Sequence, residues 1–174
     1  MSPTKPQLRL VPGEKSSGII INKVRIILAP PNKPPFPTEV KIYEEDTLLA
    51  LSAPPVITAP QEHPIRTLTK IWETEPQPQG SLLIQGRRWL ALTHDLDQDP
   101  CCDEQAVLSC LNKIWKATAQ HNIHTLALPL LGNTYKALPS ENSLDLIFSS
   151  LRNHIPPLPQ KIWLVTSAKG TGRK

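Results

Sequence analysis

Short runs of apolar residues, separated by polar and proline-rich segments, predict an alternation of strands and helices along the chain. The runs at 19–21 and 24–28 are typical of a strand, in one piece or in two pieces around Asn22 and Lys23. Further strands are predicted at residues 40–43, 55–59, 80–84, 88–94, 123–129 and 161–166. The acidic residues Glu44, Glu45 and Asp46 are then expected to open a turn or a single helical turn.

Three helices are predicted from apolar positions that recur every three or four residues. The first spans 64–72, the second begins at Asp99 and Pro100, and the third spans 140–153 with Ser140 as its cap. From residue 80 onward, strands and helices alternate, which implies parallel strands with helices packed on the sheet. The pattern therefore predicts an α/β domain.

Proline is abundant and glycine is scarce, with 20 and 7 residues among 174. Of the 20 prolines, 14 fall within the first 80 residues, and they exclude long uninterrupted helices from that part of the chain. The net charge of +4 divides into +2 for residues 1–18, +3 for residues 167–174 and −1 between them. We therefore expect a nearly neutral domain over 19–167 between flexible basic tails at 1–18 and 168–174, and no dedicated nucleic-acid binding.

The cysteines Cys101, Cys102 and Cys110 are clustered, and Cys110 falls on the apolar stripe of the second helix, so it is expected in the core. Adjacent cysteines bridge only with strain, which favours a reducing, cytoplasmic setting, and no signal segment or membrane span is predicted. His94 and the cysteines lack the paired spacing of a structural zinc site. The acidic run from Asp95 lacks the glycine and the glutamate of a calcium loop, so neither a metal nor a cofactor is predicted.

The segment that follows the predicted strand at 123–129 is the best candidate for a binding loop. It contains Leu131, Gly132, Asn133, Thr134 and Tyr135. Parallel-sheet proteins bind ligands at the carboxyl ends of their strands, and backbone N–H groups that precede a helix can hold an anion. The residues alone leave two interpretations open, a ligand loop and an ordinary connection.

Four segments between residues 80 and 166 carry a family resemblance. They are the hairpin that ends at His94, the helix at 103–121, the run HTLALPLLG at 124–132, and the last helix and strand at 140–166. In this order and spacing, they resemble the second half of a macro domain, the ADP-ribose-binding α/β/α module. The resemblance implies a three-layer α/β/α fold with a mixed sheet.

In the front half, the resemblance implies three further ligand contacts. Asp46 matches the aspartate that recognises adenine in macro domains, although its own chemistry fits a turn-capping residue equally well. Thr58 and Gln61 match the two asparagines of the family, and Gln61 is longer than the asparagine that it replaces. The segment EHP at 62–64 stands where the family has a glycine-rich phosphate stretch.

These features together predict a diverged macro-like domain that binds ADP-ribose or a related nucleotide or phosphate ligand, without catalysis. The backbone N–H groups of residues 132–135 are expected to hold a phosphate, and Asp46 an adenine amine. Two alternatives stay open. One is an ADP-ribosyl hydrolase or phosphoesterase that uses Glu62 and His63 as an acid–base pair. The other is an interaction module with a closed cleft, for which the sequence does not identify a protein partner.

Overall fold

The structure, a computed structural model, describes residues 18–51 and 75–166. Several predictions fall outside the described residues. They are the tails at 1–17 and 168–174, the strand at 55–59, the helix at 64–72, and the positions Thr58, Gln61, Glu62 and His63. The domain boundaries drawn from the sequence stay predictions.

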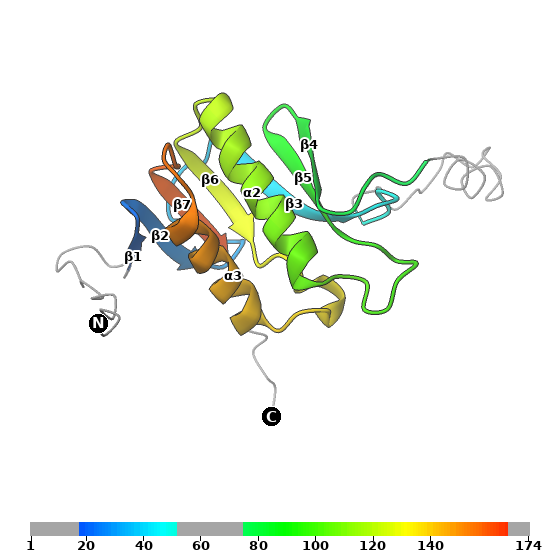
Figure 1. Cartoon of the computed structure of the whole chain (residues 1–174). Coiled ribbons are helices and arrows are strands. Elements are labelled where there is room, and N and C mark those ends of the chain that lie inside the picture. Colours follow the sequence, from blue (N-terminus) through cyan, green and yellow to red (C-terminus); the bar gives the residue numbers. More distant parts are fainter. Residues whose placement is uncertain (1–17, 52–74, 167–174) are drawn as a thin grey trace.

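A seven-stranded mixed sheet with the strand order β1-β2-β7-β6-β3-β5-β4 forms the body of the described structure (Figure 1). Its strands are β1 (Ile19–Ile21), β2 (Val24–Ala29), β3 (Val40–Asp46), β4 (Ser81–Gln85), β5 (Arg88–His94), β6 (Thr125–Pro129) and β7 (Lys161–Val165). The strands β2, β7, β6, β3 and β5 are parallel, whereas β1 and β4 run antiparallel at the two edges. The parallel strands therefore end at a common edge of the sheet.

Two helices, α2 (Glu104–Gln120) and α3 (Ser140–Asn153), lie side by side over one face of the sheet (Figure 1). Fully buried side chains such as Trp115 on α2 and Leu151 on α3 form the core with the sheet. The indole Nε1 of Trp115 donates to the hydroxyl of Ser150 at 2.7 Å, which ties the helices together. Cys110 is also fully buried, as predicted. The predicted α/β fold with a mixed sheet is confirmed.

The prediction that β3 ends at residue 43 is wrong, because the strand continues through Glu44 and Glu45 to Asp46. These residues pair in parallel with β5, and a register shift follows Glu45. Glu45 and Asp46 are fully buried, and their carboxylates accept backbone N–H groups of the turn that follows. The run of three acidic residues favoured a turn, but these hydrogen bonds allow buried carboxylates to lie at the end of a strand.

The predicted start of the second helix and the predicted capping role of Ser140 need correction, whereas α3 spans the predicted residues 140–153. Helix α2 begins at Glu104 rather than at Asp99, because Asp103 is the residue whose side chain caps it, accepting the N–H of Ala106 at 2.8 Å. Ser140 is the first residue of α3 and makes no capping hydrogen bond there. Its hydroxyl accepts from the side-chain amide of Asn133 at 3.1 Å instead, so it braces the preceding loop.

The first predicted strand is two strands, the hairpin β1–β2, with Asn22 and Lys23 at positive φ in its turn. Such a turn matches the twist of the strands that it joins. Within the described residues, no helix is both long and apolar enough to cross a membrane.

Candidate functional site

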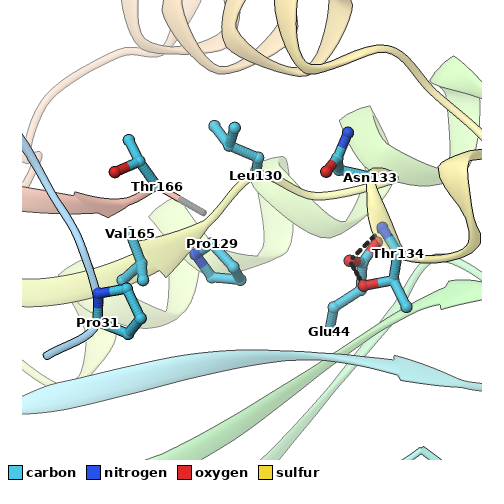
Figure 2. Close-up of a pocket in the computed structure, with 8 residues that line it drawn as sticks. All are labelled: Pro31, Glu44, Pro129, Leu130, Asn133, Thr134, Val165 and Thr166. Carbon is cyan, nitrogen blue, oxygen red and sulfur yellow. Dashed lines mark hydrogen bonds between the residues drawn. The ribbon is translucent and has the colours of Figure 1, made fainter. Parts of the chain in front are cut away.

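A pocket of about 270 Å³ lies at the carboxyl ends of β2, β7, β6 and β3 (Figure 2). Its lining residues are Pro31, Glu44, Pro129, Leu130, Asn133, Thr134, Val165 and Thr166. In Figure 2, Pro31, Pro129 and Val165 gather at one end of the pocket, and Glu44 and Thr134 face one another at the other end. The pocket therefore has an apolar end and a polar end.

Glu44 occupies the polar end and accepts hydrogen bonds from β5 and from the loop after β6. Its Oε1 faces Nε2 of His94 at 2.8 Å and the hydroxyl of Thr93 at 2.9 Å, both on β5. The same oxygen accepts the backbone N–H of Gly132. Its Oε2 accepts the backbone N–H of Thr134 at 3.3 Å and the hydroxyl of the same residue. Five donors therefore surround one carboxylate.

These donors keep Glu44 charged although only 6% of its side chain is exposed. Burial by itself raises the pKa of the carboxyl, but the hydrogen bonds from His94, Thr134 and Gly132, and the charge of His94 when its ring is protonated, lower it by more. The resulting pKa lies below the ordinary glutamate range, so the side chain is an anion at neutral pH.

The predicted phosphate loop therefore does converge on an anion, but the anion is the protein's own carboxylate. Gly132 and Thr134 both direct their N–H groups at Glu44, as a phosphate-binding loop directs them at its ligand. Gly132 has a φ of +84°, and a Cβ at this position would lie 2.6 Å from Cδ1 of Leu138. Only glycine fits there without strain.

The other predicted loop residues have separate structural roles. Leu131 is fully buried in the core. The side-chain amide of Asn133 donates to the carbonyl of Leu138 at 3.1 Å, and its backbone N–H donates to Leu130. Tyr135 adopts a φ of +57° and is 54% exposed, and its ring lies edge-on to the ring of His94 at a centroid distance of 5.3 Å. Tyr135 and Lys136 both have positive φ, whereas Asn133 has a φ of −83°.

Asp46 is fully buried at the end of β3 and caps the turn that follows. Its carboxylate accepts the backbone N–H of Leu48 at 2.7 Å, of Leu51 at 2.9 Å and of Ala50 at 3.0 Å. These are the contacts of the turn-capping interpretation. The adenine contact of Asp46, like the ligand contacts of Thr58 and Gln61, stays a prediction.

Glu44 was not predicted as a site residue, although the sequence carries a signal for it. Val40 and Ile42 are buried on alternate positions of β3, and Glu44 continues that alternation. A strand that continued to residue 44 would have placed its carboxylate on the inward face. Among the described residues, no three His, Cys, Asp or Glu side chains form a group that could hold a metal ion.

Solved macrodomain structures share this architecture. The Oceanobacillus iheyensis macrodomain with ADP has a TM-score of 0.60 and 12% identity, covering 88% of this chain and 89% of that chain. The macrodomain of Thermus aquaticus DarG has a TM-score of 0.53 and 16% identity, covering 81% and 97%. The macro domain of ganglioside induced differentiation associated protein 2 has a TM-score of 0.57 and 9% identity, covering 91% and 85%. No protein-family model and no curated protein matches the sequence. At these identities the likeness extends to the fold, and the chain has the macrodomain fold.

Proposed function

We propose that this domain binds ADP-ribose or a smaller related nucleotide in the pocket at the carboxyl ends of β2, β7, β6 and β3, without catalysing its hydrolysis. The observation that carries the proposal is the convergence of the Gly132 and Thr134 N–H groups on one anion. A loop arranged in this way has the donors that a phosphate needs. Structures of the Oceanobacillus iheyensis macrodomain with ADP and with ADP-ribose support the choice of ligand class.

The shape of the pocket supports a nucleotide with one phosphate near the loop. Pro31, Pro129 and Val165 offer an apolar surface for a ring, and Thr134 offers donors at the opposite end. Ligand pockets commonly measure roughly 300–1,000 Å³, so the 270 Å³ observed here suits a part of ADP-ribose better than the whole molecule.

A phosphate can bind at this loop only if the Glu44 carboxylate moves away from the N–H groups of Gly132 and Thr134. Two anions within a few ångströms repel one another strongly in a partly buried site. The affinity of the native chain for a phosphate is therefore reduced by the fraction of molecules in which Glu44 has left the loop. We propose that this competition makes nucleotide binding weak in the native protein.

The proposal is tested by calorimetry with ADP-ribose and with AMP on the native chain and on Glu44→Ala. Removing the carboxylate frees the Gly132 and Thr134 donors, so Glu44→Ala is expected to bind at least about 10-fold more tightly. Glu39→Ala is the matched control, because Glu39 also accepts two backbone N–H groups, from His124 and Thr125, in front of β6. It is expected to bind like the native chain.

A second candidate function is favoured by the same carboxylate. Since Glu44 fills the anion position of the loop, the domain could serve as an interaction module with a closed cleft. In that case neither the native chain nor Glu44→Ala binds ADP-ribose or AMP at millimolar concentration, while both remain folded. That result would overturn the nucleotide proposal.

A further inference from the structure

Three side chains lie in line at the carboxyl ends of β5 and β3. The Sγ atom of Cys101 lies 3.4 Å from Nδ1 of His94, and Nε2 of the same ring lies 2.8 Å from Oε1 of Glu44. Cys101 comes from the segment before α2, His94 ends β5 and Glu44 belongs to β3. A thiol, an imidazole and a carboxylate are therefore joined by two hydrogen bonds.

The charge of Glu44 determines the direction of both hydrogen bonds. An ionised carboxylate can only accept, so Nε2 of His94 carries the proton that it donates to Glu44. In a neutral ring, Nδ1 is then an acceptor, and it faces the thiol of Cys101. His94 is thus held in the tautomer that can take the proton of the thiol. The carboxylate would stabilise the imidazolium that forms.

The three cysteines differ in their surroundings, and within residues 18–51 and 75–166 only Cys101 contacts a histidine. Cys102 is 1% exposed and its thiol faces the carbonyl of Asp103, while Cys110 is fully buried and faces the carbonyl of Ser81. Burial raises the pKa of Cys102 and of Cys110 to about 12. Cys101 is partly exposed. We therefore expect a reagent in solution to reach Cys101 before the two buried thiols, which serve as internal controls.

The backbone around Cys101 is held in place relative to His94. The side-chain amide of Gln79 donates to the carbonyls of Thr93 at 2.9 Å and Cys101 at 3.1 Å, and the N–H of Asp95 donates to Cys101 at 2.7 Å. The ring of Tyr135 packs against the imidazole. Such support keeps a nucleophile and its base at a constant separation.

We propose that Cys101 is the nucleophile of a thiol-based site that accepts the acyl group of an ester, with His94 as its base and Glu44 as the positioning residue of His94. The base takes a proton and can return it, which suits a reaction whose leaving group needs one. Disulfide exchange fits less well, because the neighbouring thiol of Cys102 is buried and its pKa is high. This inference does not depend on nucleotide binding.

The covalent step needs only Cys101, His94, the ester and water. The sulfur of Cys101 attacks the carbonyl carbon while its proton passes to Nδ1 of His94. The carbon–oxygen bond of the ester then breaks, and the leaving oxygen takes that proton. Water subsequently attacks the thioester, the carbon–sulfur bond breaks, and the proton that water loses returns to Cys101 through His94.

The first test measures the reactivity of the folded native chain. Iodoacetamide at neutral pH is expected to modify Cys101 about 10-fold faster than it modifies glutathione, with Cys102 and Cys110 unmodified by mass spectrometry. The acyl probe p-nitrophenyl acetate is expected to release a first equivalent of p-nitrophenolate in a rapid burst, before the slower hydrolysis of the thioester, and to leave an acetyl group on Cys101 during that burst. Reaction no faster than that of glutathione, or acetylation elsewhere, would overturn the proposal without the need for any variant.

The second test separates chemistry from structure by a pH profile of the alkylation rate. The titratable groups around the pair are Glu44, Asp95, Cys102, Asp103 and Tyr135. His94→Asn is expected to slow acylation by about 100-fold and to move the inflection of the profile upward. Glu44→Gln is expected to move the inflection in the same direction, with near-ultraviolet circular dichroism as the check on folding. A profile that neither substitution moves would show a merely structural cluster and overturn the proposal.

Discussion

Glu44 and Thr134, 90 positions apart in the sequence, meet through two hydrogen bonds, from the backbone N–H and from the hydroxyl of Thr134 to Oε2 of Glu44. A carboxylate of the protein thereby takes the position on this loop that we propose for the phosphate of a ligand. The same carboxylate holds His94 on its other oxygen. Loop stability, anion binding and the state of the imidazole therefore depend on one side chain.

Replacement of Glu44 by alanine is expected to lower the free energy of unfolding by about 3 kcal/mol, because the donors around a buried carboxylate lose their acceptor. Formate or inorganic phosphate is expected to restore part of that stability by occupying the vacated position. Thermal unfolding with and without the anion measures the effect. Glu39→Ala is the control, since its carboxylate is half-exposed. Equal stabilisation of both variants by the anion would contradict the prediction.

The pKa of Glu44 predicts how stability changes with pH. Because the pKa is lower in the folded state than in the unfolded chain, the contribution is fully present above the unfolded pKa and is lost as pH falls through the folded one. The stability difference between the native chain and Glu44→Gln is therefore expected to shrink as the pH falls below the unfolded pKa of about 4.3 and through the lower folded one. Urea unfolding at several pH values measures it.

Glu39→Gln provides the comparison for this pH series. The backbone N–H groups of His124 and Thr125 lower the pKa of Glu39 as well, in that order of effect, but solvent screens this exposed side chain. We expect a smaller change with pH for this substitution. A Glu44→Gln difference that stays constant across the range would refute the linkage.

Gly132 and Gly86 both have positive φ, so alanine substitutions at the two positions distinguish the cost of an unfavourable φ from the cost of a steric clash. Gly132→Ala is expected to lose about 2 kcal/mol or more, because the new Cβ meets Leu138 in addition to adopting an unfavourable φ. Gly86→Ala is the matched control, with a φ of +59° and no atom within 4 Å of the new Cβ. It is expected to lose about 1 kcal/mol. Chemical denaturation compares them, and equal losses would mean that Leu138 moves aside freely.

Asp46→Ala is expected to lower the free energy of unfolding by about 2 kcal/mol, since three turn N–H groups lose their acceptor. Asp46→Asn keeps one carbonyl acceptor and should lose less. The predicted adenine contact is tested by calorimetry, which compares the affinity for AMP and for ribose 5-phosphate between Glu44→Ala and the double variant with Asp46→Asn. Weaker binding of AMP with unchanged binding of ribose 5-phosphate would support that contact, and equal changes would assign Asp46 to the turn alone.

Much of the architecture follows from local pattern. The period of apolar residues predicted α3 with its observed bounds and the hairpin β4–β5, because burial of one face imposes a regular spacing on each element. The predicted start of α2, at Asp99, comes before the observed start at Glu104, since aspartate is a good capping residue at both position 99 and position 103. Only the geometry of the preceding segment selects Asp103.

The contacts of the site join residues far apart in the sequence, so the local pattern of residues does not predict them. The residues at 131–135 left a ligand loop and an ordinary connection open, the resemblance favoured a phosphate loop, and the N–H groups of Gly132 and Thr134 converge on an anion. That Glu44 supplies this anion, and that Glu44 also joins His94 to Cys101, could not be predicted along the chain. Nothing near Glu44 in the sequence indicates a partner 88 residues away.

The sequence by itself determined the order of strands and helices, the glycine of the loop and the small, polar character of the residues around it. Tertiary structure alone decided which groups meet there. Strand β3 lies between β6 and β5 in the sheet, so a side chain near its end lies beside the loop after β6 and the histidine at the end of β5. Periodicity reports which face of an element is buried, whereas strand order and register determine what that face contacts.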